Sequence, residues 1–120
     1  MKIAFTTTGD TLEAPLDSRF GRAPRFIIYD LEKDSFEVVD NRQNLNTAQG
    51  AGIQAAETIG RAKVNYLITG HCGPKAFRVL NAAGIAVYNC SEATVADALR
   101  AFREGILHSF DAADVEGHWI

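Results

Sequence analysis

Short apolar runs and longer amphipathic stretches alternate along the chain, and their spacing predicts the secondary structure. Runs rich in β-branched and aromatic residues predict five strands, at residues 2–7, 25–30, 36–40, 66–69 and 85–88. Apolar positions three or four residues apart predict three helices, from a cap at Thr47 to about Arg61, from Pro74 to a stop at Gly84, and from a cap at Thr94 to a stop at Gly105. In the third helix, Thr94 and Asp97 resemble a capping box.

The order of these elements predicts an α/β fold with a mixed sheet. The turn at residues 32–35 is short, so the strands on either side of it should form an antiparallel hairpin. The later strands alternate with helices, and right-handed crossovers make the fourth and fifth strands parallel and adjacent. We expect one domain over residues 1–108, followed by an irregular tail at residues 109–120.

Composition and charge exclude several classes of protein. The chain has 120 residues with 47% hydrophobic and 22% charged residues, an ordinary globular balance that argues against disorder. A net charge of −3 does not favour nucleic acid as a partner, because nucleic-acid binding usually requires a basic face. No apolar run approaches the roughly 20 residues that span a bilayer, and the N-terminus leads directly into a strand. We therefore expect a cytoplasmic protein that binds neither membrane nor nucleic acid.

The loop Gly70-His71-Cys72-Gly73-Pro74, between the predicted fourth strand and second helix, is the expected ligand-binding site. In open sheets of this kind, ligands bind beyond the carboxyl ends of the parallel strands. The glycines let the backbone approach a ligand closely and adopt positive φ, and the start of the helix favours an anion. The same field should lower the pKa of Cys72 towards the thiolate, a soft metal ligand. The alternative is a purely geometric loop in which the cysteine is a small buried hydrophobe.

The second cysteine is open to the same two interpretations. Cys90 ends the fifth strand, at the same predicted edge of the sheet as Cys72. It is either a second metal ligand or a core residue. Two cysteines are too few for a disulfide scaffold or a four-thiolate site within one chain.

Two further segments add groups suited to an anion. Residues 17–24 contain Arg19 and Arg22, whose guanidinium groups hold charge at any pH and bind oxoanions or anionic clusters. The alternative is a structural loop in which Arg19 pairs with Asp17 and Phe20 anchors the loop in the core. Gly50-Ala51-Gly52 opens the first helix and presents backbone amides.

Together, three segments resemble the dinitrogenase iron–molybdenum cofactor biosynthesis family. They are residues 18–24 with the strand that follows, the Gly50-Ala51-Gly52 opening, and residues 70–77 with the later Ala83-Gly84-Ile85. The resemblance covers the chain to about Leu107 and implies a three-layer α/β/α, ribonuclease H-like fold with a five-stranded mixed sheet. Members of the family carry iron–sulfur or molybdenum-containing clusters. Many relatives have a histidine just before the Gly-x-Gly, where this chain has Gln49.

The resemblance implies a set of site residues. His71 and Cys72 are the expected metal ligands, with Cys90 as a further candidate. The groups expected to contact an iron–sulfur or molybdenum–sulfur cluster are Ser18, Arg19, Arg22, Gly50, Gly52, Gly70, Gly73 and Lys75. His108 and His118 are weaker candidates near the C-terminus.

The expected function is that of a cluster carrier without enzymatic turnover. Its partners would be a client apo-protein or a cluster-assembly protein, and a homodimer is one way to complete the coordination of the metal. An enzyme with Cys72 as nucleophile and His71 as base is the second hypothesis, although adjacent side chains on an extended backbone point apart. The third is an anion-binding regulatory module that uses only backbone amides and arginines.

Overall fold

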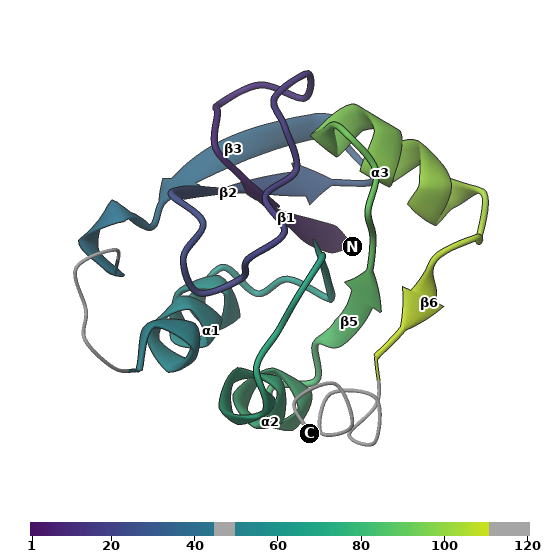
Figure 1. The fold of residues 1–120 in the computed structure, drawn as a ribbon. Helices are drawn as coiled ribbons and strands as arrows, with labels where there is room; N and C mark the ends of the chain where they lie inside the picture. The colour runs from purple at the N-terminus through teal and green to yellow at the C-terminus, as the bar shows by residue number, and fades with distance from the viewer. Residues whose placement is uncertain (45–49, 111–120) are drawn as a thin grey trace.

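A computed structural model of the chain describes residues 1–44 and 50–110 (Figure 1). Its sheet has six strands in the order β3-β2-β1-β4-β5-β6. The strands are β1 (Lys2–Thr7), β2 (Arg25–Asp30), β3 (Ser35–Asp40), β4 (Tyr66–Thr69), β5 (Ala86–Asn89) and β6 (His108–Ser109). The helices are α1 (Ala51–Arg61), α2 (Pro74–Ala82) and α3 (Val95–Arg103), with a 3-10 turn, η1, at Arg42–Asn44.

The sheet is mixed, as the element order predicts. β2 pairs antiparallel with both β1 and β3, so the hairpin prediction is confirmed. β4 pairs parallel with β1 on one side and with β5 on the other, which confirms that the fourth and fifth strands are parallel neighbours. At the centre of the sheet, Phe5 of β1 lies beside Ile27 of β2 and Ile68 of β4.

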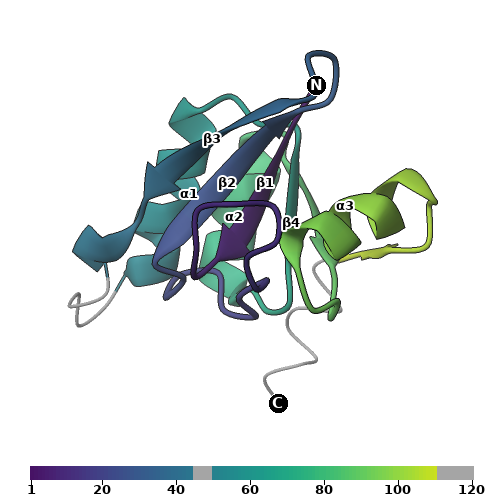
Figure 2. The same cartoon turned by 90° about the horizontal axis from the view of Figure 1, so that it is seen from above.

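Helices cover both faces of the central strands, which explains why those strands are apolar almost throughout. α1 and α2 share one apolar cluster with Ala4, Phe26 and Leu67 of the sheet. α3 packs on the opposite face, in a second cluster with Phe5 and Ile27. Figure 2 shows the resulting three layers, with α1 and α2 on one side of the sheet and α3 on the other. No helix in the described ranges is both long and apolar enough to cross a membrane.

α3 begins where the sequence predicts, and the N–H groups of its first turn are hydrogen-bonded to neighbouring residues. The Thr94 side chain accepts a hydrogen bond from the backbone N–H of Asp97 at 3.1 Å, which confirms the predicted cap. The backbone N–H groups of Val95 and Ala96 donate to carbonyls of the long loop between β1 and β2, at 3.0 and 2.7 Å. The first turn of this helix therefore has three donors already engaged.

Three predictions about the elements are wrong. The sheet has six strands, because His108 and Ser109 pair with Asn89 and Tyr88. Ser109 therefore belongs to the sheet and not to an irregular tail, and Phe110 donates its backbone N–H to Val87 O at 2.8 Å. A strand of two residues is too short to produce a periodic pattern.

The third error concerns the first helix. α1 begins at Ala51 with Gly50 as its N-cap, so the predicted start of this helix is wrong. Thr47 and His118 lie outside the described residues. The ribonuclease H-like assignment stays a prediction.

Candidate functional site

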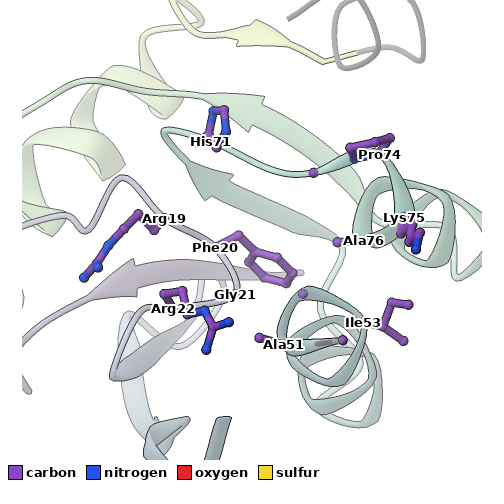
Figure 3. A pocket seen from close by; sticks show the side chains of 13 residues that line it. Arg19, Phe20, Gly21, Arg22, Ala51, Ile53, His71, Pro74, Lys75 and Ala76 are labelled. Carbon is purple, nitrogen blue, oxygen red and sulfur yellow. The ribbon is translucent and has the colours of Figure 1, made fainter. Parts of the chain in front are cut away.

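A cavity of about 500 Å³ lies where the loops that follow β1 and β4 meet the start of α1 (Figure 3). Because both loops leave the carboxyl ends of parallel strands, the cavity is at the predicted edge of the sheet. Its lining residues are Arg19, Phe20, Gly21, Arg22, Gly50, Ala51, Gly52, Ile53, His71, Gly73, Pro74, Lys75 and Ala76.

Backbone contacts fix the two loops against each other. The backbone N–H of Phe20 donates to the carbonyl of His71 at 3.1 Å, and Arg19 and His71 form an isolated parallel bridge. The Phe20 ring is 2% exposed and lies 5.7 Å from the Phe26 ring, so Phe20 is a core anchor, as the structural alternative proposed. Loops held in this way give a cavity wall that exists before any ligand arrives.

Glycines let these segments approach more closely than a side chain would permit. A Cβ on Gly70 would lie 2.9 Å from the Cβ of Ser18, and a Cβ on Gly21 would lie 2.8 Å from the backbone nitrogen of Gly52. Gly70 thus packs closely against Ser18, whereas close approach of the loop backbone to a ligand stays a prediction. The prediction of positive φ is wrong for Gly73, at −69°, and for Gly70, whereas Gly50 has a φ of 80°.

Both helices that border the cavity begin without a capping side chain. The N-caps of α1 and α2 are Gly50 and Gly73, and neither provides a side-chain hydrogen bond. The first intrahelical bonds run from Gln54 N to Gly50 O and from Phe77 N to Gly73 O. The N–H groups that precede these bonds have no partner within the helix, and together with the helix dipoles they favour an anion. α3, whose first-turn donors are engaged, has no such role.

Cationic residues line the same cavity. They are Arg19, Arg22 and Lys75, and none of the described lining residues is acidic. With two helix N-termini at the same place, the local field is positive although the chain carries a net charge of −3.

Arg19 contributes less to this field than its position suggests. The Asp17 carboxylate, which is 4% exposed, accepts bonds from the backbone N–H of Arg19 at 2.9 Å and from its guanidinium at 3.1 and 3.2 Å. These hydrogen bonds raise the pKa of Arg19 and offset its charge locally. In Figure 3, Arg19 points away from the cavity, whereas Arg22 points towards the start of α1. The structural alternative for Arg19, pairing with Asp17, is confirmed.

Cys72 is buried, as in the alternative of a small buried hydrophobe. Its side chain is 3% exposed and belongs to the core cluster under α1 and α2, and Cys72 does not line the cavity. Burial raises its pKa to about 12, because desolvation disfavours the thiolate. The prediction of a lowered pKa is therefore wrong, and His71 and Cys72 do not share one cavity. As a metal ligand, Cys72 stays a prediction.

Cys90 lies in a different environment from Cys72. It belongs to the apolar cluster on the α3 face, whereas Cys72 belongs to the cluster on the opposite face of the sheet. Its Sγ accepts a bond from the backbone N–H of Glu92 at 3.5 Å, and burial raises its pKa. Cys90 lines a separate cavity with Glu92 and His108. Within residues 1–44 and 50–110, no three His, Cys, Asp or Glu side chains form a group that suits a metal ion.

The predicted site residues divide into two sets. Those that line the cavity are Arg19, Arg22, Gly50, Gly52, His71, Gly73 and Lys75. Those that do not are Ser18, Gly70, Cys72 and Cys90. Sequence reasoning missed Ala76, a small residue in the first turn of α2 that follows closely on the glycine cap. A small residue just after a glycine-opened helix is the signal that would have identified it.

Known proteins resemble this chain in both sequence and structure. The model of the dinitrogenase iron-molybdenum cofactor family matches residues 1–105. An uncharacterised protein of Methanocaldococcus jannaschii is 31% identical over 114 residues, covering 92% of each chain. The apo form of the orange protein from Desulfovibrio gigas is 38% identical with a TM-score of 0.88, over 91% of this chain and 92% of that one.

A second solved structure agrees with these matches. A Thermotoga protein named as a candidate NifB protein is 38% identical with a TM-score of 0.80, over 90% of this chain and 91% of that one. The family match extends from the first residue through α3 and so includes both loops of the cavity and both glycine-opened helices. The chain therefore belongs to the dinitrogenase iron-molybdenum cofactor family.

Proposed function

We propose that this protein carries an anionic metal–sulfur cluster, held in the cavity as cargo and released to a client protein. One observation carries the proposal: two glycine-capped helix starts and basic side chains converge on a single cavity. Such a site recognises negative charge and accessible acceptor atoms, and it does so without requiring a particular metal.

The residues present fit a cluster that keeps its own sulfur ligands. Sulfide atoms at the surface of a metal–sulfur cluster accept hydrogen bonds from backbone N–H groups, and α1 and α2 supply such groups at the cavity. Lys75 and Arg22 would offset part of the negative charge of the cluster. A thiolate bond from Cys72 does not fit this site, because its side chain lies in the core behind the cavity wall.

Attachment through hydrogen bonds and charge alone suits a carrier. A cluster held in this way leaves without the breaking of a metal–thiolate bond, so a client that offers thiolates can take it. Family membership supports the choice of cargo, since the family takes its name from the iron–molybdenum cofactor of dinitrogenase. We propose no catalytic turnover for this site, because the thiol of Cys72 is protonated and enclosed at neutral pH.

Anaerobic titration with tetrathiomolybdate, and separately reconstitution with iron and sulfide, tests the proposal. We expect wild-type protein to retain metal through gel filtration, and Cys72→Ser to retain the same amount. Lys75→Gln, which removes one exposed cation at the start of α2, should bind more weakly at low salt and should lose less affinity at high salt. Failure of the wild-type protein to retain metal under all these conditions would contradict the carrier function.

A simpler anion-binding module is the second candidate. The burial of Cys72 favours it, because no thiol among the described lining residues restricts binding to metal-containing anions. Competition distinguishes the two functions. If phosphate or molybdate displaces tetrathiomolybdate at equal concentration, the site recognises anions in general, whereas a carrier should prefer the larger sulfur-rich anion at least tenfold, about 1.4 kcal/mol.

A further inference from the structure

Asn41 is a fully buried polar residue outside the cavity lining, and its nitrogen atoms donate three hydrogen bonds to one wall of the cavity. It follows directly after β3 and is 0% exposed. Its side-chain amide donates to Ala23 O at 2.7 Å and to Gly21 O at 3.3 Å, and its backbone N–H donates to Pro24 O at 2.8 Å. One residue thus binds three carbonyls of the loop that carries Gly21 and Arg22.

The direction of these bonds matters for a site that binds anions. A carbonyl oxygen carries partial negative charge, and in a trans peptide the carbonyl and the following N–H point in opposite directions. Because Asn41 is buried and does not line the cavity, the carbonyls that it binds are turned towards the interior. Oxygen atoms that would repel an anion are in this way kept out of the wall.

The same contacts also set the distance between the two walls. Gly21 lies against the first turn of α1, where a Cβ on it would meet the backbone nitrogen of Gly52 at 2.8 Å. A shift of the loop at residues 21–24 therefore changes its distance from the backbone N–H groups at the start of α1. Asn41 is the side chain that holds the 21–24 end of the loop, whereas the Phe20–His71 bond holds the other end.

We propose that Asn41 is a positioning residue for anion binding, which turns the carbonyls of Gly21, Ala23 and Pro24 inward and holds this loop against the start of α1. The role rests on the proposed function of the cavity. It acts through the loop, because Asn41 itself does not reach the ligand.

Three variants of the full chain test the proposal, each titrated anaerobically with tetrathiomolybdate at a temperature where circular dichroism shows the fold intact. Asn41→Ala removes both side-chain donors and should lower the affinity by about tenfold or more, whereas Asn41→Ser keeps one donor and should lose less. Leu99→Ala is the matched control, because it removes a buried side chain from the α3 cluster on the opposite face of the sheet. It should lower the melting temperature without changing the affinity.

Amide NMR spectra provide a readout that general destabilisation would not move. The resonances of Gly21 and Gly52 should shift in Asn41→Ser and stay unchanged in Leu99→Ala. If Asn41→Ala does not fold, Asn41→Ser decides the question with the same two measurements. Wild-type affinity in both Asn41 variants, or an equal loss in Leu99→Ala, overturns the role of Asn41 alone. Absence of binding by the wild-type protein overturns the proposed function and this role with it.

Discussion

Gly73 allows a substitution that should separate binding from stability. It is the N-cap of α2, with a φ of −69° and a ψ of 161°, the extended conformation that capping residues adopt. A Cβ at this position meets no atom within 4 Å. Gly73→Asp therefore introduces no clash, and its carboxylate can accept bonds from the first-turn N–H groups of α2.

The two consequences of Gly73→Asp have opposite signs. As an N-cap, Asp stabilises a helix by only a few tenths of a kcal/mol more than Gly does. A negative charge at a helix start adds about 0.3–1 kcal/mol of stability, so the melting temperature should stay the same or rise. For a separation of about 5 Å between the same carboxylate and a bound anion, at an effective dielectric constant of about 20, the repulsion is about 3 kcal/mol for each unit of ligand charge, or roughly a hundredfold in affinity.

Gly73→Asn is the matched control, because it has the same shape and capping ability without the charge. We expect Gly73→Asn to lose much less affinity for the anion than Gly73→Asp. Added salt should reduce the difference in affinity between the two variants, because it screens the repulsion. Anaerobic tetrathiomolybdate titration gives the affinities, and thermal unfolding followed by circular dichroism gives the stabilities. Unchanged affinity in Gly73→Asp, with the fold intact, would refute the assignment of the anion to the start of α2.

Two further predictions concern stability. Thr94→Ala removes the cap on Asp97 N and should cost about 1 kcal/mol in urea unfolding while tetrathiomolybdate binding is unchanged, and a loss of binding would contradict the separation of α3 from the site. The pKa of Cys72 is raised to about 12 in the fold, so its contribution to stability is complete below the unfolded-state pKa of about 8.5 and is lost as the pH rises towards 12. Between pH 8 and 10, wild-type protein should therefore lose up to about 2 kcal/mol more stability than Cys72→Ala, and equal losses would show that the thiol ionises readily in the fold.

The regular elements could be predicted because their signals are local. The apolar run of β1, the Thr94 cap and the Pro74 helix start each depend on neighbouring residues, and each is confirmed. β6 could not be predicted, because two residues carry no period and pair only through contact with β5. The start of α1 was misplaced for a similar reason, since Thr47 is a good cap by type whereas the helix begins after Gly50.

The site was predictable in outline because glycine-rich loops after strands mark the edge where ligands bind. What sequence could not decide was which side of a loop each side chain faces. Cys72 and His71 are adjacent, yet only His71 lines the cavity, and burial reverses the pKa shift expected from the helix start. Arg19 likewise sits at the cavity but is bound by the buried Asp17. Asn41 carried no recognisable signal, because its role depends on carbonyls about 20 residues away in the sequence.

Amide NMR during tetrathiomolybdate titration is the most direct test of the account, because it reports where the anion lies. We predict that the largest shifts occur at the amides of Ala51, Gly52, Lys75 and Ala76, and that they persist in Cys72→Ser. Shifts centred on Cys90 and His108, or shifts that disappear in Cys72→Ser while the protein stays folded, would contradict the claim that two glycine-capped helix starts form the binding site.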